Sequence, residues 1–334
     1  MNPTVLAFET SCDETAVAVV RGREVLSNVL SSQVELHARF GGVVPEVAAR
    51  AHVEAIRSLT HRALTDAGVH PDDLDAVAAT EGPGLIGALL VGHSFAKATA
   101  WARQLPFVGI DHMEGHLFSP LLEHPDYRPP AVVLLASGGH SQLVHVEEWG
   151  TYRVLGETID DAAGEAFDKL ARVMGLGFPG GPAIDAASEG GNPDAVRFPR
   201  ALPDRRHEFS FSGLKTSVIT FLDKARASGD LPPLADVAAS VQEAIVDVLV
   251  AKTLNAAEDT GARVIGGGGG VLANRRLRRR LMDEASERGI EVYLPSPQLA
   301  TDNGAMIGAA AVHWLERGTI TSWESTVDAG RRLG

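Results

Sequence analysis

Three short apolar strands followed by helices are predicted twice along this 334-residue chain, and this doubled order constrains its fold more than any other feature. Runs of β-branched and apolar residues between polar or glycine-containing turns are typical of strands. Each set is followed by helical patterns that alternate with further strands, an order that predicts parallel crossovers. We therefore expect an α/β protein with two similar lobes around a cleft. The six strands are predicted at residues 5–8, 15–20, 24–29, 132–135, 142–146 and 152–157.

Helical periodicity and breaks at glycine or proline predict the other elements. A helix from Pro45 is ended by Gly68, and the segment Gly82-Pro83-Gly84 opens a helix that runs through Trp101. Residues 192–214 are predicted to form a long irregular excursion. The other predicted strands are 74–80, 107–110, 263–265 and 291–294, and the other predicted helices are 162–174, 183–188, 234–259, a basic helix to Arg288 and a last helix from Asp302.

The composition is that of an ordinary soluble folded protein, with 45% hydrophobic and 22% charged residues. The net charge of −13 argues against a surface that attracts phosphate backbones everywhere. A nucleic acid would therefore have to bind at a local basic region. The single Cys12 excludes an internal disulfide framework and suits a reducing compartment. The start of the chain does not resemble a secretory signal, and no apolar run is long enough to span a membrane. We expect a cytoplasmic protein that does not bind a membrane.

The 35 glycines cluster at the ends of predicted strands, where they indicate turns that could bind phosphate. Glycine lets the backbone approach a phosphate closely, and successive amide groups in a turn then point at the anion. The runs fit neither the P-loop nor the Rossmann pattern. For any single run, tight turning and close packing are an equally good explanation. The turns rich in small residues are 9–15, 137–140, 175–181 and 266–270, and Asn274 follows the last of them near a helix start where adenine or ribose could be held.

His112 and His116 are four residues apart, a spacing that places both imidazoles on one face of a helix. Neutral imidazole is a common ligand of Zn²⁺ and Fe²⁺, and such a site needs a third ligand from elsewhere. Asp302 is the candidate, although a carboxylate at the start of the last helix could equally be an ordinary N-cap. For the pair alone, surface or hydrogen-bonded roles are the simpler explanation in a chain with 12 histidines. Glu114 does not directly follow His112, so the HExxH motif of metallopeptidases is absent.

Clustered charges suggest further binding residues. Asp161, Glu165 and Asp168 fall on one face of a predicted helix, and neighbouring carboxylates repel each other unless a cation, hydroxyl or ribose engages them. Favourable charges at a helix N-terminus would explain Asp161 but not Asp168. The arginines of 275–280 are expected to form a solvated helix face balanced by nearby acids. The irregular segment has fewer local counter-charges and is the better candidate for RNA contact through Arg197, Arg200, Arg205 and Arg206.

Ten ordered motifs resemble those of the tRNA N6-adenosine threonylcarbamoyltransferase family, formerly labelled O-sialoglycoprotein endopeptidases. They run almost from end to end of the chain, so together they are far more specific than any one glycine run. The motifs are ETSCDET at 9–15, GGVVPEVAARAH at 41–52, EGPGLIGALLVG at 81–92, HMEGHL at 112–117, SGGHSQL at 137–143, DDAAGEAFDK at 160–169, FPGGP at 178–182, FSFSGLKT at 209–216, GGGGGVLAN at 266–274 and TDNGAMI at 301–307.

The resemblance implies two ribonuclease-H-like lobes of the actin/Hsp70/sugar-kinase superfold with a nucleotide and metal cleft between them, which agrees with the doubled strand order. The lobes would be residues 1–115 with about 303–330, and residues 116–302. The implied activity is transfer of a threonylcarbamoyl group from threonylcarbamoyl-adenylate to N6 of adenosine 37 in tRNAs that read ANN codons, with release of AMP.

The resemblance also assigns site residues by motif. One divalent metal ion, Fe²⁺ in preference to Zn²⁺, would be bound by His112, His116 and Asp302. Proton transfer could be assisted by Asp13, Glu14 or His140, an assignment that the residues themselves support weakly. The adenylate would be held by Leu135, Ala136, Ser137, Gly138, Gly139, Asp168, Gly181, Asp185 and Asn274.

Two other functions fit the same fold, because a fold does not fix chemistry. One is phosphoryl transfer by an ATP-dependent kinase or ATPase, and the other is a nucleotide-switched binding protein without catalysis. The imidazole pair with Asp302 favours the transferase, since kinases of this fold bind Mg²⁺ through phosphates and carboxylates. The resemblance implies an inactive paralogue and a small ATPase as partners, and the helix from Pro45 is the candidate contact for the paralogue.

Overall fold

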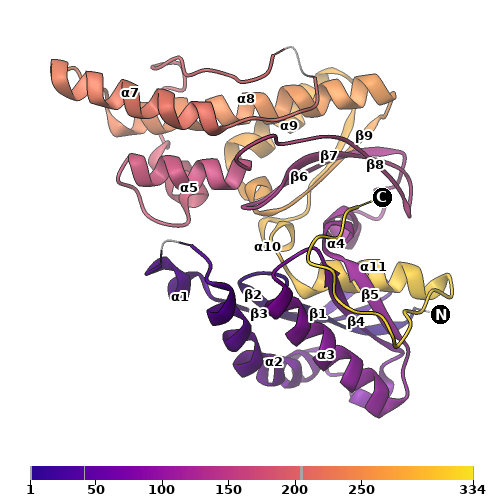
Figure 1. Cartoon of the computed structure of the whole chain (residues 1–334). Helices are drawn as coiled ribbons and strands as arrows, with labels where there is room; N and C mark the ends of the chain where they lie inside the picture. Colours follow the sequence, from indigo (N-terminus) through magenta and orange to yellow (C-terminus); the bar gives the residue numbers. More distant parts are fainter. Residues whose placement is uncertain (1, 41, 204–205, 334) are drawn as a thin grey trace. The chain divides into compact units, whose positions relative to one another are not determined.

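The computed structural model describes residues 2–40, 42–203 and 206–333 (Figure 1). The chain divides into two compact units, of which unit 1 is Met1–Asp126 with Asp302–Leu333 and unit 2 is Tyr127–Thr301. The predicted lobe boundary at residue 115 would divide helix α4 (His112–Phe118), whereas the structure keeps all of that helix in unit 1. In the described part of the chain, no helix is both long and apolar enough to cross a bilayer.

Unit 1 is built on a five-stranded sheet in the order β3-β2-β1-β4-β5. The first three strands form an antiparallel meander, and β4 and β5 run parallel to β1. Both the meander and the parallel crossover are as predicted. All residues of the central strand β1 are buried, which fits a sheet covered on both faces. The strands are β1 Thr4–Glu9, β2 Glu14–Arg21, β3 Glu24–Ser32, β4 Ala76–Gly82 and β5 Phe107–Asp111.

Helices cover both faces of the unit 1 sheet. α2 and α3 pack on one face and α11, yellow in Figure 1, packs on the other. α2 begins with Pro45 at its first position and ends before Gly68, which adopts φ 63° in the left-handed region, so both predicted ends are confirmed. The helices of this unit are α1 Val34–Ala38, α2 Pro45–Ala67, α3 Ile86–Arg103, α4 His112–Phe118 and α11 Gly304–Glu316, with short 3₁₀ turns at Pro71–Asp73 and Ser119–Leu122.

Unit 2 repeats the topology of unit 1. Its sheet has the order β10-β9-β6-β7-β8, in which β6, β7 and β8 form the antiparallel meander and β9 and β10 are the parallel additions. Each unit is therefore a ribonuclease-H-like sheet, and the predicted two-lobed α/β fold is confirmed. The strands are β6 Ala131–Ala136, β7 Ser141–Glu148, β8 Thr151–Glu157, β9 Val264–Gly268 and β10 Glu291–Tyr293.

The long helix α8 organises the rest of unit 2. It is buried over most of its surface, packs on β6 and carries α6 and α9 beside it (Figure 1). Helix α7 was not predicted. The irregular segment was expected to run to residue 214, whereas a regular helix begins at Ser212. The helices are α5 Ala163–Val173, α6 Gly180–Ala187, α7 Ser212–Ser228, α8 Leu234–Thr260, α9 Arg275–Glu287 and α10 Pro297–Ala300, with a 3₁₀ turn at Gly270–Ala273.

The glycine run 266–270 is only partly a turn, contrary to the prediction. Gly266, Gly267 and Gly268 belong to strand β9. A methyl group on Gly266 would lie 2.5 Å from the hydroxyl of Tyr127, and one on Gly267 would lie 2.7 Å from a methyl of Leu294. Glycine fits these two strand positions because neighbouring side chains already fill the space that a Cβ would need.

Candidate functional site

The short helix α4 presents the two candidate imidazole ligands. It follows β5 directly, and Asp111 caps it because Oδ1 accepts hydrogen bonds from Met113 N at 2.8 Å and Glu114 N at 3.1 Å. Every residue of the helix is buried. The spacing of His112 and His116 therefore does place both rings on one helix, in a part of unit 1 that excludes most solvent.

Asp302 meets both imidazoles. Its Oδ1 lies 3.1 Å from His116 Nε2 and 3.7 Å from His112 Nε2, and one ligand atom from each of the three residues lies within 4.8 Å of the others. All three belong to unit 1. The alternative role of Asp302 as an N-cap is wrong, because Asn303 caps α11 by accepting a hydrogen bond from Met306 N at 3.0 Å.

These three residues fit a divalent metal ion. Two imidazole nitrogens and one carboxylate oxygen are a common protein ligand set for Zn²⁺ and for non-haem Fe²⁺, and such a set leaves coordination positions open for substrate. The fit rests on the donor types and on their convergence in a buried place. The geometry does not select between the two metals.

Glu9 supports His112 from behind and was missed by the sequence analysis. It is completely buried at the end of β1, and its Oε2 lies 3.0 Å from His112 Nδ1 and accepts a hydrogen bond from Thr80 Oγ1 at 2.6 Å. A carboxylate on Nδ1 fixes the ring so that Nε2 faces Asp302. The only sequence signal was an acid ending an apolar strand, which does not reveal its partner 103 residues away.

Electrostatics make Glu9 and His112 an ion pair in the metal-free chain. Burial opposes charge on His112, but the carboxylates of Glu9 and Asp302 outweigh it and raise the pKa of the imidazole to about 9. Burial also opposes charge on Glu9, but the charge and hydrogen bond of His112 and the hydrogen bond from Thr80 hold the pKa of the carboxyl below its usual range. His112 must therefore lose a proton when a metal binds.

Replacing Glu9 with glutamine is expected to weaken metal binding by about ten- to a hundredfold. The amide keeps the size of the side chain but places an N–H where His112 Nδ1 needs an acceptor, so the ring loses its preferred tautomer. A competition titration with Zn²⁺ and a chromophoric chelator measures the change. Asp75→Asn is the matched control, because the Asp75 carboxylate accepts from Thr4 N at the other end of β1. Equal affinities for the two variants would contradict the role of Glu9.

Two of the three predicted proton-transfer residues lie where β1 connects to β2 in unit 1: Asp13 is in the turn and Glu14 is the first residue of β2. Ser32 Oγ donates a hydrogen bond to Glu14 Oε1 at 2.9 Å, and the backbone carbonyl of Asp13 accepts one from Gln33 N at 3.0 Å. Burial and the charges of Asp13 and Asp302 raise the pKa of Glu14 to about 9. Glu14 therefore lies within the electrostatic field of the candidate metal ligand. The third residue, His140, belongs to unit 2 and is exposed on the β6–β7 turn.

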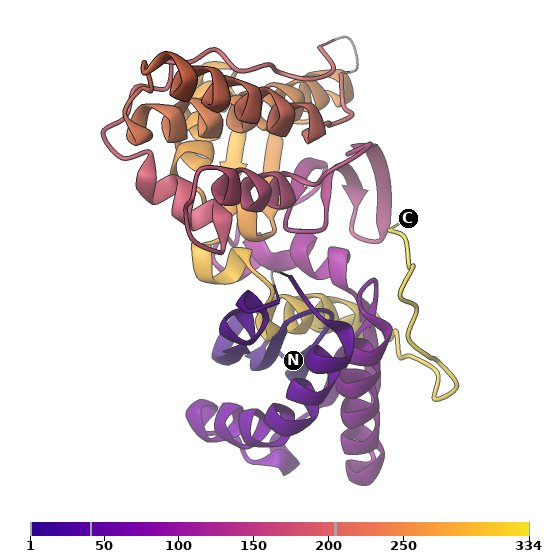
Figure 2. The same ribbon diagram turned by 60° about the vertical axis from the view of Figure 1, so that its left-hand side comes forward.

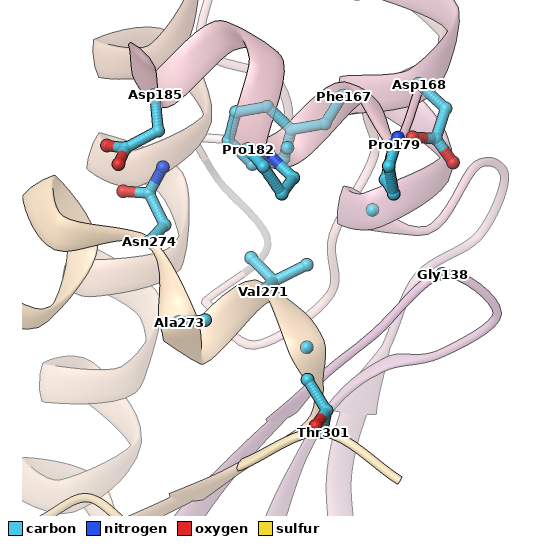
Figure 3. A pocket seen from close by; sticks show the side chains of 13 residues that line it. Gly138, Phe167, Asp168, Pro179, Pro182, Asp185, Val271, Ala273, Asn274 and Thr301 are labelled. Carbon is cyan, nitrogen blue, oxygen red and sulfur yellow. The ribbon is translucent and has the colours of Figure 1, made fainter. Parts of the chain in front are cut away.

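Unit 2 contains a cavity of about 460 Å³, the size of a small-ligand pocket. Five of the predicted adenylate residues line it, and Figure 3 shows them on opposite sides: Asp185 and Asn274 face each other at one end, while Asp168 and Gly138 lie toward the other. The walls between them are mostly apolar. The lining residues are Gly138, Gly164, Phe167, Asp168, Pro179, Gly181, Pro182, Asp185, Gly270, Val271, Ala273, Asn274 and Thr301.

Local hydrogen bonds hold the polar residues of the pocket in place. Asp168 Oδ1 accepts from Gly180 N at 2.6 Å and so fixes the start of α6. Asn274 caps α9 through Leu277 N and donates to Gln242. These contacts show that the predicted acids and amide shape the pocket as well as line it.

The other predicted adenylate residues lie around the β6–β7 turn. Leu135 and Ala136 are buried within β6, so their side chains do not line the cavity. Ser137 Oγ accepts from the backbone N of His140 at 3.1 Å and closes the turn. Gly139 is exposed, and it does not line the cavity.

Several clustered charges have partners that the sequence did not reveal. Lys169 Nζ pairs with Asp161 at 2.7 Å and Glu165 at 2.9 Å, so these acids form a local surface network. The arginines of the irregular segment have few counter-charges nearby in the sequence, but two of them find partners far along the chain. Arg200 pairs with Asp247 at 2.5 Å, and Arg206 pairs with Asp259 at 2.8 Å, both on α8. Arg197 is exposed, and Arg205 lies outside the described residues.

Comparison with known proteins gives one consistent family. The family model described as tRNA N6-adenosine threonylcarbamoyltransferase matches residues 24–309. A protein of that name from Clostridium perfringens is 50% identical over 332 residues, which is 99% of this chain and 98% of that protein. Another from Clostridioides difficile is 51% identical over 310 residues, 92% of each chain.

Solved structures share the fold at low sequence identity. Component A of (R)-2-hydroxyglutaryl-CoA dehydratase from Acidaminococcus fermentans aligns with a TM-score of 0.58 and 15% identity, covering 95% of this chain and 100% of that one. Full-length HypF in a phosphate- and nucleotide-bound form aligns with a TM-score of 0.62 and 14% identity, covering 96% of this chain and 56% of that one. These likenesses agree with the fold deduced from the two sheets.

Proposed function

Because this chain belongs to the tRNA N6-adenosine threonylcarbamoyltransferase family, we propose that it transfers a threonylcarbamoyl group from threonylcarbamoyl-adenylate to N6 of adenosine 37 in tRNAs that read ANN codons. AMP is the other product. The observation that carries the proposal is the match of relatives with this named activity over nearly the whole chain. The kinase alternative is not favoured, since the buried ligand set in unit 1 contains two imidazoles.

The adenylate is proposed to occupy the cavity of unit 2. Its volume of about 460 Å³ and its apolar walls suit an adenosine moiety, and Asp185 and Asn274 offer polar groups at one end. Nothing lies within 4 Å of the Cβ position at Gly138, so the backbone of the β6–β7 turn is open on the cavity side, where phosphate could approach amide groups. Gly164 lets the first turn of α5 pack against this turn, because a Cβ there would lie 2.6 Å from Ser137 O. The predicted residues Leu135, Ala136, Ser137 and Gly139 are proposed to support this turn rather than to contact the base.

His112, His116 and Asp302 are proposed to hold one divalent metal ion, with iron(II) preferred to zinc. Such an ion would supply Lewis acidity to a carbonyl or phosphoryl oxygen. The adenosine N6 loses a proton when it is acylated, and Asp13 is the proposed acceptor because its charge and that of Asp302 both act on Glu14, which places it near the candidate ligands. Glu14, whose pKa is raised to about 9, holds a proton at neutral pH and is proposed to donate a hydrogen bond instead. His140 is an additional candidate from unit 2. The residues of the site thus bind, orient and deprotonate, while the donor carries its own leaving group.

The activity is tested by incubating the purified chain, loaded with Fe²⁺, with threonylcarbamoyl-adenylate and unmodified tRNA, in the presence of its partner proteins. Mass analysis of the digested nucleosides is expected to show threonylcarbamoyl-adenosine and stoichiometric AMP. A parallel incubation with ATP and sugars is expected to give no phosphorylated product. Phosphorylated sugar without modified nucleoside would replace the transferase by the kinase.

A paralogue is proposed to dock on an apolar face made by α2 and α3. The two helices pack where a methyl group on Gly87 would lie 3.4 Å from Ala49 Cβ. Val53, one turn beyond Ala49, is 62% exposed, and Leu90, one turn beyond Gly87, is 45% exposed. With Ile86, these side chains are exposed apolar residues on the two neighbouring helices. This is the helix from Pro45 that the sequence suggested for the contact.

Val53→Asp is expected to weaken association with the paralogue by about tenfold or more, because a charge would be buried at an apolar contact. Titration calorimetry of the two purified proteins measures the affinity, and thermal unfolding of the isolated chain is expected to be unchanged. Met282→Asp on α9 is the control, since Met282 is also half exposed but lies on unit 2. Equal affinity of the two variants for the paralogue would contradict a contact on α2.

A further inference from the structure

The last segment of unit 1, residues 319–333, forms what we call the C-terminal strap (Figure 2). It has no regular secondary structure, yet it hydrogen-bonds to two strands of the sheet. Thr321 N donates to Phe107 O of β5 at 2.9 Å, and Asp328 N donates to Glu81 O of β4 at 2.8 Å. The strap therefore follows the two strands whose ends lead to the site: β5 continues directly into the ligand helix α4.

Arg331 of the strap lies between two buried carboxylates. Its NH1 is 2.8 Å from Glu81 Oε2, and its Nε is 3.3 Å from Asp111 Oδ2. Each acidic side chain is only 7% exposed, whereas that of Arg331 is 38% exposed. Buried carboxylates are costly unless they are paired, so one guanidinium from the strap compensates acids at the ends of both β4 and β5.

Asp111 connects Arg331 to the ligand helix. Its Oδ1 accepts the two hydrogen bonds that cap α4, and its Oδ2 has no hydrogen-bond partner within the described residues, so its compensation there is the ion pair with Arg331. The capping residue immediately precedes His112. A change in the position of Asp111 would therefore be passed to the first turn of α4 and to the ring that faces Asp302.

Glu81 gives Arg331 a second connection to the same histidine. Burial opposes charge on Glu81, but the nearby His93 imidazole and the hydrogen bond and charge of Arg331 hold the pKa of this carboxyl below its usual range. The preceding residue on β4 is Thr80, whose hydroxyl donates to Glu9, the carboxylate behind His112. Arg331 therefore holds Glu81, the residue next to Thr80, and Thr80 in turn contacts the carboxylate that orients the His112 ring.

We propose that Arg331 is a positioning residue for the candidate metal centre: it locks Asp111 and Glu81, and through them the first turn of α4 that carries His112. It touches none of the ligand atoms itself. The inference rests on the proposed metal role of His112, His116 and Asp302, so its test includes a measurement on the metal-free protein.

The alternative is that the strap only covers the sheet. Other contacts attach the strap without reaching the acids at the strand ends: Lys97 Nζ donates to Trp323 O at 2.6 Å and to Ser325 O at 2.8 Å, and the Trp323 ring stacks on Phe107. Lys97→Ala is therefore a matched control. It removes a cation that holds the strap but leaves the ion pairs of Arg331 in place.

The experiment compares Arg331→Ala with Lys97→Ala in the full chain. Hydrogen exchange, followed by mass spectrometry in the absence of metal, is expected to become at least about tenfold faster for peptides containing Met113 and Glu114 in the first variant only, because those amides depend on Asp111. Titration with Co²⁺ is expected to show affinity weakened by about tenfold in the first variant, with altered visible absorption bands that report ligand geometry. Lys97→Ala should speed exchange in the strap alone.

A second variant keeps the proposal testable if Arg331→Ala destabilises the chain. The double variant Arg331→Ala with Asp111→Asn keeps the carbonyl oxygen that caps α4 and removes a charge that has lost its partner. It is expected to regain slow exchange in α4 and most of the Co²⁺ affinity. Faster exchange in α4 with unchanged Co²⁺ affinity and spectrum would show that Arg331 holds α4 in place but would refute its role in positioning the metal ligands. Identical exchange and Co²⁺ binding in the two single variants would overturn the proposal for Arg331.

Discussion

Replacing His116 with glutamine is expected to eliminate metal binding and to slow threonylcarbamoyl transfer to tRNA by about a thousandfold or more. His116 Nε2 lies 3.1 Å from Asp302 Oδ1, so its loss leaves His112 and Asp302 as an incomplete ligand set. Lewis-acid stabilisation of a transition state is worth several kcal/mol, and about 1.4 kcal/mol corresponds to a tenfold change in rate. Metal analysis of the purified variant and single-turnover transfer kinetics measure the two effects.

Glutamine is chosen because His116 is almost completely buried, and alanine would leave a cavity. His70→Gln serves as the control, since His70 is an exposed histidine of the same unit, close to a 3₁₀ turn. The control is expected to retain metal and activity. If the His116 variant loses metal but transfers at the normal rate, the ion has a structural role only.

Replacing Gly181 with leucine is expected to weaken binding of the adenylate by about a hundredfold, or about 2.8 kcal/mol, without lowering the thermal stability of the chain. Gly181 lines the cavity of unit 2, and nothing lies within 4 Å of the position its Cβ would take. The side chain can therefore be accommodated by the fold, but it occupies ligand space. Equilibrium binding of a non-hydrolysable adenylate analogue measures the affinity.

The neighbouring glycines separate blocking from misfolding. Gly177→Leu is the control, because Gly177 also has open space around it but does not line the cavity. Gly180 is unsuitable, since a Cβ there would lie 2.5 Å from Asp168 Cα and would displace the backbone. Unchanged affinity in the Gly181 variant would place the adenylate outside this cavity.

The sequence predicted the elements of the fold well because each depends on local pattern. Apolar runs rich in β-branched residues, Pro45 at a helix start and Gly68 at its end are all local signals, and each was confirmed. The histidine spacing was equally informative, because four residues on a helix fix the direction of two side chains. Helix α7 was missed because its first turn lies within a segment interpreted as irregular.

Long-range partners were beyond reach of such patterns. Glu9 meets a histidine 103 residues later, and Arg331 meets an acid 250 residues earlier, so no local spacing reveals either contact. The same reason explains why the partner of Arg200 was not foreseen, since its counter-charge is 47 residues away on α8. Asp302 was found as a ligand candidate, but its role as a cap was wrong because the adjacent Asn303 has the better position.

The glycine strand β9 limits how this protein can change during evolution. Because the hydroxyl and ring of the buried Tyr127 occupy the space beside Gly266, an alanine there requires a smaller residue at position 127, whereas the Leu294 methyl beside Gly267 ends a flexible side chain that can move aside. A single substitution at Gly266 is therefore expected to destabilise the chain, whereas a paired exchange with Tyr127 is tolerated. Sequences of descendants are expected to keep Gly266 and Tyr127 together or to change both.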